Sequence, residues 1–186
     1  MRISDTRDFA RAAFTGALKG LIGLGIATLL CSNASAQADV KSTAKTSGLV
    51  TQKNLSLPIA KTIAEAALAE CQAKGYHTAV AVVDRAGQVL VILRDELATA
   101  QHADMARRKA YTARMFRIPT SEFEKRTGDP SYAAQRNLPD VLALGGGVPI
   151  QVGNEAIGGV ASAGSTQEQD EACAKAGVGK VADLLK

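Results

Sequence analysis

Apolar residues recur every three or four positions in three segments of the chain, and this spacing predicts amphipathic helices over residues 56–75, 99–116 and 166–185. Gly75 ends the first helix, and the second ends before Pro119 because the residue preceding a proline avoids helical geometry. Alanines line one face of the second helix, which lets that face approach a sheet or another helix closely: Ala103, Ala106, Ala110 and Ala113.

Runs rich in β-branched residues separate these helices and predict two hairpins of short strands. The predicted strands are Val80–Val83, Val89–Leu93, Val148–Val152 and Ala156–Ala161. Asp84-Arg85-Ala86-Gly87 joins the first pair and Gly153-Asn154 joins the second, and both sequences are typical of turns. Because hairpins pair their strands antiparallel, the chain predicts an α+β fold: a single domain whose central, mainly antiparallel sheet carries flanking helices.

The segment 120–140 is polar and irregular, and we expect only a short helix there, from Ser121 to Arg126. Thr120 or Ser121 would cap that helix, with the Glu124 side chain reaching back to Ser121. Thr166 is the expected cap of the last helix. Acidic residues in its first turn favour the positive end of the helix dipole: Glu168, Asp170 and Glu171.

Residues 1–36 have the parts of a secretory signal peptide. Four basic residues precede an apolar run of ten, 21–30, which is too short to cross a bilayer that requires about 20 apolar residues. Ala34-Ser35-Ala36 predicts cleavage after Ala36, so an uncleaved membrane anchor is the less favoured alternative. Leu30 before Cys31 disfavours lipid attachment, because a lipoprotein signal places a small residue there.

Cleavage would leave a polar, flexible N-terminus at 37–55 and a folded domain at 56–186. We therefore expect a periplasmic or secreted protein, with no stable membrane insertion once the signal is removed. Without the four cations and two anions of the signal, the totals of 22 Lys and Arg and 18 Asp and Glu give a net charge of +2. This weak charge, with no tryptophan and 4% aromatic residues, argues against a nucleic-acid partner.

Two cysteines, Cys71 and Cys173, remain after the signal. Export permits a disulfide between them, but both lie among apolar helical residues, so two buried free thiols are the favoured interpretation and a disulfide is the alternative. No C-x-x-C pattern indicates a zinc or thioredoxin-like site, and no G-x-S-x-G pattern indicates a hydrolase. Gly145–Gly147 lacks the lysine and the following helix of a phosphate loop. A structural turn is the favoured interpretation, and close approach to a flat ligand is the alternative.

The stretch RRKAYTARMFRIPTSEF, residues 107–123, combines cations with a tyrosine, a proline and hydroxyl residues. It is either a solvated helix with its exit turn or the wall of a site for an acidic ligand. Lys109 lies on the alanine face and needs a partner there, for which Asp84 and a ligand carboxylate are the candidates. We expect His77 at an exposed strand edge. His102, in a first helical turn, is either a ligand or an ordinary helix-terminal residue.

Four segments together resemble the GlcG/HbpS family of haem-binding proteins, also called DUF336. They read VAVVDRAGQVLVILRDE, ARRKAYTARMFRIPTSEF, ALGGGVPIQV and AIGGVASAGSTQEQDEACAKAG, and the resemblance spans about residues 55–186. It implies a profilin- or PAS-like sandwich, self-assembly into a homo-oligomer from dimer to octamer, and haem binding in exported members, one of which partners a membrane sensor protein. Other members accompany metabolic genes without a settled reaction.

By position, the resemblance places Thr120 in the haem pocket and the helix from Lys109 to Ala113 beside it. Cations suit the two haem propionates, and alanine and glycine faces suit the macrocycle. The expected cofactor-binding residues are His102, Lys109, Tyr111, Arg114 and Thr120, with His102 and Thr120 as the metal ligands. Relatives often carry another polar residue at position 102, so His102 is either an added ligand or incidental.

We therefore predict an exported haem-binding protein that sequesters haem, senses it or degrades it slowly. The alternative is a small organic-acid-binding enzyme or metabolic accessory protein of the GlcG type, with the acid between Lys109, Arg114 and Asp84. A third interpretation is an oligomeric scaffold whose glycines and alanines serve packing alone. The sequence assigns no catalytic residue and leaves open whether the protein is an enzyme.

Overall fold

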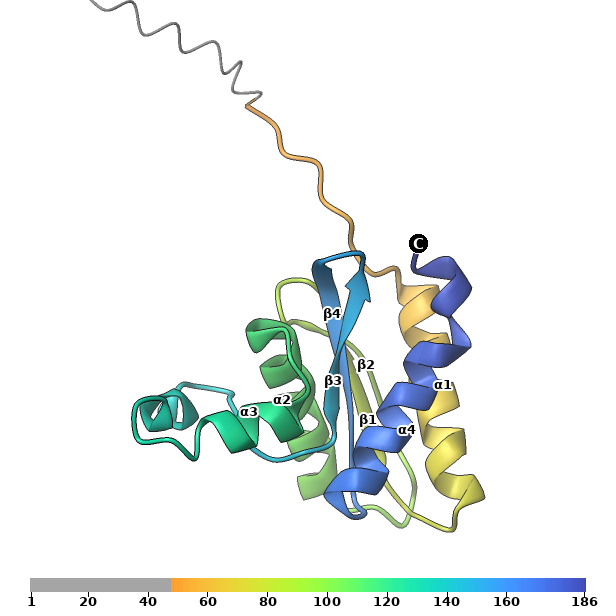
Figure 1. Cartoon of the computed structure of the whole chain (residues 1–186). Helices are drawn as coiled ribbons and strands as arrows, with labels where there is room; N and C mark the ends of the chain where they lie inside the picture. The colour runs from red at the N-terminus through yellow and green to blue at the C-terminus, as the bar shows by residue number, and fades with distance from the viewer. Residues whose placement is uncertain (1–47) are drawn as a thin grey trace, which may run out of the picture. The chain divides into compact units, whose positions relative to one another are not determined.

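A four-stranded antiparallel sheet lies at the centre of the computed structural model, which describes residues 48–186 (Figure 1). The strands are β1 (Ala79–Val83), β2 (Val89–Arg94), β3 (Gly147–Val152) and β4 (Glu155–Ala163), in the spatial order β2-β1-β4-β3. Both predicted hairpins form, and β1 pairs with β4 to join them, with Val82 opposite Val160. The fold class is the predicted α+β class. The signal peptide predicted for residues 1–36 lies outside the described residues.

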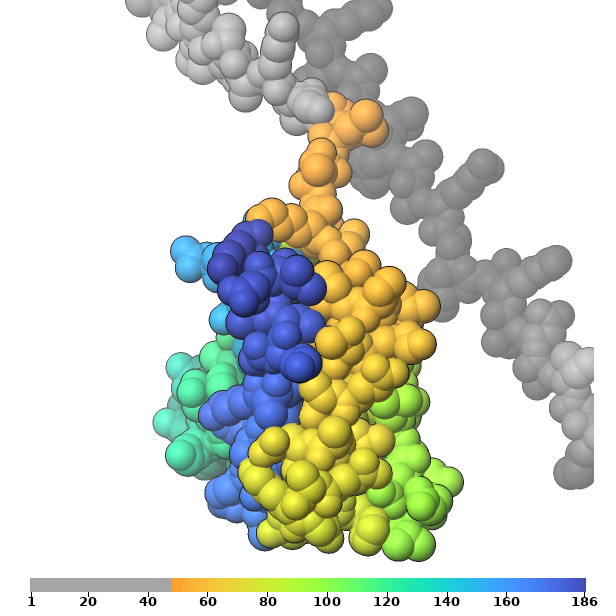
Figure 2. Space-filling view, turned by 90° about the vertical axis from the view of Figure 1, so that its right-hand side faces the viewer, coloured from red at the N-terminus to blue at the C-terminus, as the bar shows by residue number. Residues whose placement is uncertain are grey.

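Helices cover both faces of the sheet. α1 (Leu57–Ala73) and α4 (Gln167–Lys180) pack side by side on one face, and α2 (Ala100–Phe116) covers the other (Figure 1 and Figure 2). The short α3 (Thr120–Arg126) follows α2, and 3-10 turns occupy Ala133–Asn137 and Ala182–Leu184. None of the helices within residues 48–186 is long and apolar enough to cross a membrane.

Two helix ends differ from the sequence prediction. α3 begins at Thr120, directly after Pro119, so Ser121 lies inside the helix and the predicted Ser121 capping box is wrong. The fixed φ of the proline sets the helix entry one residue earlier than the hydroxyl pattern indicated. α4 ends at Lys180 rather than Leu185, because Gly177 and Gly179 lower the helix propensity of its last turn. The Thr166 cap is confirmed, since its Oγ1 accepts a hydrogen bond of 3.3 Å from the Gln169 N–H.

The two faces of the sheet bury side chains of different size. Facing α1 and α4, the core is aliphatic and includes Ile63, Val80, Val82, Ile150 and Val160. Facing α2, the core is almost entirely alanine: Ala79, Ala81, Ala106, Ala110, Ala161 and Ala163, with Val83. Gly159 of β4 permits the close approach of α2, because a Cβ there would lie 2.3 Å from the Ala110 carbonyl oxygen. The predicted close packing of the alanine face is confirmed.

A disulfide joins the two helices of the aliphatic face. Cys71 in α1 and Cys173 in α4 are bonded, with their Cα atoms 5.6 Å apart, and both residues are fully buried. The favoured prediction of two free thiols is therefore wrong. The pairing links positions 102 residues apart in the sequence, so only the packing of α1 against α4 brings the two sulfurs together.

Candidate functional site

A buried ion pair lies under the glycine turn that precedes β3. Lys109 is only 1% exposed, and its Nζ lies 3.0 Å from Asp170 Oδ2 and 3.2 Å from the Ser162 carbonyl oxygen. The predicted pairing of Lys109 with Asp84 is therefore wrong, because the partner comes from the first turn of α4. Gly146, with φ +125°, packs directly on this pair, since a Cβ there would lie 2.8 Å from Lys109 Nζ.

Thr120 supports the same glycine turn. Its side chain is fully buried, and its Oγ1 accepts a hydrogen bond of 2.8 Å from the Gly147 N–H. A Cβ at Gly147 would lie 2.7 Å from the Lys109 carbonyl oxygen, so the turn requires glycine for its contact with α2. The favoured interpretation of the triple glycine as a structural turn is confirmed. Contact between Thr120 and an iron atom would require the packing that buries this side chain to open.

His102 lies at the opposite end of α2 from Arg114. The two residues are separated by 12 positions, or about 18 Å along a helix axis. His102 completes a capping box with Thr99: the His102 N–H donates to Thr99 Oγ1 at 3.3 Å, and the Thr99 N–H donates to His102 Nδ1 at 3.4 Å. The structure thus gives His102 a local role at the helix start. His77 is exposed, as predicted, and its Nδ1 lies 3.0 Å from Asp95 Oδ1.

Tyr111 borders an apolar cavity of about 390 Å³ on the outer face of α2. The lining residues are Tyr111, Met115, Phe116, Leu138, Pro139 and Val141. The Tyr111 ring lies against the turn between β1 and β2, because a Cβ on Gly87 would stand 2.7 Å from its Cδ2. Met115 and Leu138 are 44% and 50% exposed, so the cavity opens to solvent between large apolar side chains.

Arg114 borders a second, more polar cavity of about 700 Å³. The lining residues are Gln52, Asn54, Leu55, Asp84, Arg85, Ala86, Leu90 and Arg114. Arg114 Nε is buried and has no hydrogen-bond partner among the described residues. Burial lowers the pKa of the Arg114 guanidinium from its usual value, and the charges of Arg85 and Arg117 lower it further, against an opposing effect of Asp84. This is an unsatisfied cation facing an open space.

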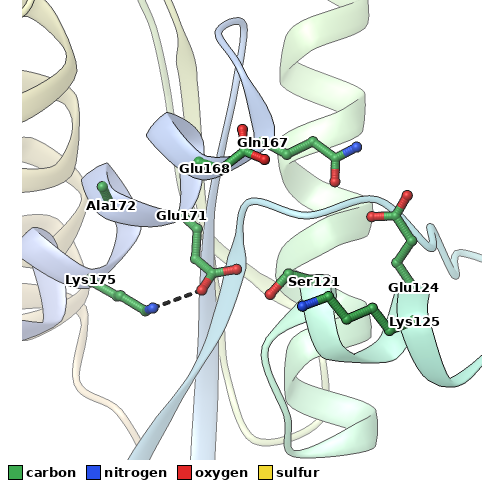
Figure 3. A pocket seen from close by; sticks show the side chains of 8 residues that line it. All are labelled: Ser121, Glu124, Lys125, Gln167, Glu168, Glu171, Ala172 and Lys175. Atoms are coloured by element: carbon green, nitrogen blue, oxygen red, sulfur yellow. Dashed lines mark ion pairs between the residues drawn. The ribbon is translucent and has the colours of Figure 1, made fainter.

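A third cavity, of about 640 Å³, lies between α3 and α4 and is shown in Figure 3. Its walls carry charges of both signs: Glu124, Lys125, Glu168, Glu171 and Lys175, with Ser121, Gln167 and Ala172. Glu171 and Lys175 form an ion pair of 2.7 Å, the dashed line in the figure. Within residues 48–186, no group of three or more His, Cys, Asp or Glu side chains could hold a metal ion. None of the predicted site residues lines this cavity.

The structure therefore divides the five predicted site residues into three places. Tyr111 and Arg114 lie three positions apart on α2, where helix neighbours share a face, and each borders a cavity. Lys109 and Thr120 are buried under the glycine turn, and His102 stands apart. Sequence reasoning missed two walls of the cavities, the segment 138–141 and residues 52–55. Leu138, Pro139 and Val141 form an apolar group in a polar segment, a signal that could have indicated the first wall.

Comparisons with known proteins agree on one family. A family model described as "Haem degrading protein HbpS-like" matches residues 55–179. A curated relative from Citrobacter freundii, an uncharacterised 15.0 kDa protein of the dhaT-dhaS intergenic region, is 32% identical over 124 residues. That match covers 65% of this chain and 87% of the relative.

Solved structures show the same fold. A double mutant of HbpS from Streptomyces reticuli is 36% identical, with a TM-score of 0.69 over 73% of this chain and 92% of that chain. A complex of PduOC with haem is 26% identical, with a TM-score of 0.62 over 68% of this chain and 94% of that chain. The ORFY protein of Klebsiella pneumoniae, at 24% identity and a TM-score of 0.69, supports the fold alone.

Proposed function

Since this chain belongs to the HbpS-like family, we propose that it is an exported haem-binding protein that holds haem on the outer face of α2. It sequesters or senses haem, or degrades it slowly. The haem complex of PduOC supports a haem-related function. The disulfide between Cys71 and Cys173 supports export, because such bonds persist in oxidising compartments.

The proposal rests on one observation: Tyr111 borders an apolar cavity, and Arg114, three positions further along the same helix, has no hydrogen-bond partner among residues 48–186. Haem is a flat apolar ring with two propionates, so it needs apolar walls and a cation close together. The cavity beside Tyr111 fits the ring, and Arg114 fits a propionate. The cavity between α3 and α4 does not fit the ring, because charged side chains line it.

When bound, haem supplies an iron atom that proteins ligate through His, Cys, Met or Tyr side chains. Tyr111 is the side chain of this kind in the apolar cavity, apart from the thioether of Met115. His102 and Thr120 remain predicted iron ligands. Each would need a haem position different from the one proposed here, since His102 lies about 18 Å along the helix from Arg114.

We further propose that the protein acts as a homo-oligomer, from dimer to octamer. Three large side chains with apolar surface are exposed in this part of the domain: Met115, Tyr132 and Leu138. A second copy of the protein would cover them. A membrane sensor protein is the second proposed partner, on the strength of the sequence resemblance alone.

The test is a titration of residues 37–186 with hemin, followed through the Soret band. We expect saturation at one haem per subunit or per dimer, weakened at least tenfold by Leu138→Asp, which places a charge in the apolar wall. Tyr111→Phe should change the spectrum if the phenolate ligates iron, and His102→Ala and Thr120→Ala test the other two ligands. Lys125→Gln, in the cavity between α3 and α4, is the matched control and should bind as the unchanged chain does. The absence of saturable binding would overturn the proposal.

The alternative of an organic-acid-binding protein keeps only part of its predicted site. Arg114 and Asp84 line one cavity, but Lys109 is committed to Asp170. The partnerless Arg114 favours this alternative as well. No hemin binding, together with thermal stabilisation by small organic acids, would select it.

A further inference from the structure

The Arg114 side chain has no hydrogen-bond or ion-pair partner among residues 48–186. Its Nε is buried. A guanidinium stays charged in proteins and presents its N–H groups as a planar fork. A charged, partly buried donor without an acceptor is costly, so an acceptor from outside the chain is the natural way to satisfy it.

The charges around Arg114 are not balanced by neighbouring acids. The positive charges of Arg85 and Arg117 both repel the Arg114 guanidinium and lower its pKa. Glu155 is paired with Arg85. Asp84 faces the cavity, but its Oδ1 accepts hydrogen bonds from the Ala86 and Gln88 N–H groups at 2.8 Å and 2.9 Å, which commits that oxygen to the turn. A monoanion in the cavity would meet an excess of positive charge.

The N-terminal segment forms one wall of the same cavity. Arg85 Nε donates a hydrogen bond of 2.9 Å to the Lys53 carbonyl oxygen, and Leu55 is buried in the core, so the end of the predicted flexible segment 37–55 is held on the domain. The side chains of Gln52 and Asn54 line the cavity and form no hydrogen bond within the described residues. Their amides are free to bind a ligand held by Arg114.

We propose that this cavity is a carboxylate-binding site in which the Arg114 fork holds both carboxylate oxygens and residues 52–55 close over the ligand. The inference rests on the proposed function and deepens it, because it assigns one site to a carboxylate from either of two sources: a haem propionate or a free small organic acid. One unpaired guanidinium opposed by one aspartate suits a planar monoanion better than a phosphate dianion.

The first experiment measures binding by calorimetry to the purified full chain, with lactate, succinate and inorganic phosphate as free probes and with hemin and its dimethyl ester as haem probes. We expect at least one carboxylate probe to bind saturably and Arg114→Gln to weaken it at least tenfold. Arg114→Lys should also weaken it, because lysine keeps the charge but loses the fork. Arg117→Gln, which changes a nearby charge outside the cavity, is the control and should stay within twofold.

The two sources are separated by which probe responds. Tighter binding of hemin than of its dimethyl ester, with the difference lost in Arg114→Gln, identifies a propionate. Binding of lactate or succinate identifies a free acid. If no free acid binds and hemin equals its ester, or if phosphate binds more tightly than the carboxylates, the inference is wrong. Hemin binding that is unaffected by Arg114→Gln would leave the haem proposal standing and overturn this one.

The second experiment tests whether residues 52–55 cover the bound ligand. Lys53 is exposed and is a trypsin site next to Gln52 and Asn54. A carboxylate bound under the segment should slow cleavage at Lys53 severalfold, and Asn54→Leu with Gln52→Leu should remove that protection and weaken binding. If no carboxylate protects Lys53, residues 52–55 do not close over the ligand. If protection survives both substitutions, the Gln52 and Asn54 side chains do not bind it.

Discussion

The aliphatic face and the alanine face of the sheet differ in side-chain size, and their packing serves different purposes. β1 sends Val80 and Val82 toward α1 and α4, and Ala79 and Ala81 toward α2. Larger side chains remove more apolar area from water, so the aliphatic face contributes more of the hydrophobic stabilisation. The alanine face contributes less area but brings α2 against the backbone of β4 at Gly159.

This difference indicates that the alanine face positions α2 more than it stabilises the domain. Tyr111 and Met115 border the apolar cavity from the outer side of α2, and Arg114 borders the polar cavity with its Cβ close to Gly159 of β4. The inner side of α2 is fixed by close backbone contact and by the buried Lys109. A site carried on such a helix is held rigidly without large side chains beneath it. The following predictions test this comparison.

The largest effect is expected at the ion pair that links Lys109 of α2, on the alanine face, to Asp170 of α4, on the aliphatic face. Lys109→Ala leaves Asp170 buried and unpaired, so the free energy of unfolding should fall by about 3–5 kcal/mol, measured by urea denaturation. Lys175→Ala, which removes a lysine with a 62% exposed side chain from an ion pair on α4, should cost no more than about 1 kcal/mol. Replacing both buried partners, as Lys109→Met with Asp170→Leu, should recover most of the loss. A change below about 1 kcal/mol for Lys109→Ala would contradict a structural role of the pair.

On the aliphatic face, the disulfide should have the next largest effect. Cys71→Ala with Cys173→Ala should lower the free energy of unfolding by about 2–5 kcal/mol, because the bond closes a long loop in the unfolded chain. Thermal unfolding of the double variant and of the reduced protein should agree. An unchanged melting temperature in both would show that the packing of α1 on α4 suffices by itself.

A single added methyl group tests the close approach of α2 to β4. Gly159→Ala places a Cβ 2.3 Å from the Ala110 carbonyl oxygen, so α2 must shift outward and the domain should lose about 1–3 kcal/mol. Gly179→Ala is the control, because a Cβ there meets nothing within 4 Å and helix propensity favours alanine by about 1 kcal/mol. If hemin or carboxylate binding weakens in Gly159→Ala but not in Gly179→Ala, the alanine face positions the site.

The smallest effect concerns pH at the end of α1. A hydrogen bond from Gln72, then one from the Leu97 N–H, and the neighbouring His77 lower the pKa of Asp95 from its usual value, against an opposing effect of burial. A depressed pKa in the folded state stabilises the protein above the unfolded pKa of about 3.9, and this stabilisation is lost as the pH falls through the folded value. Asp95→Asn should therefore reduce stability at pH 7 and flatten its acid dependence below about pH 4, seen in melting temperatures. Parallel acid curves for both proteins would exclude this role.

The elements with local signals were predictable from the sequence. The turn Asp84-Arg85-Ala86-Gly87 between β-branched runs indicated the first hairpin, and the spacing of alanines indicated the close face of α2. The partner of Lys109 was not predictable, because Asp170 lies 61 residues away and α4 brings it there only in the folded chain. The disulfide was undecided for the same reason.

The candidate site was predictable only in part. The family resemblance and the needs of haem indicated Tyr111 and Arg114 as site residues, but they could not show that His102 would cap its own helix or that Thr120 would hold Gly147. The cavities depend on residues 52–55 and 138–141, whose positions relative to α2 no local pattern specifies. A partnerless arginine is also invisible in a sequence, since it is defined by the absence of acids that the fold places elsewhere.

The bond between Cys71 and Cys173 also determines what happens when the backbone is cut. It closes residues 71–173 into a covalent ring that contains the whole sheet, and the exposed stretch 128–140 lies inside that ring. A single cleavage in this stretch by a protease opens the ring but leaves both fragments in one molecule. The nicked protein would migrate as one species until a reductant is added, so cleavage there does not separate α1 from α4.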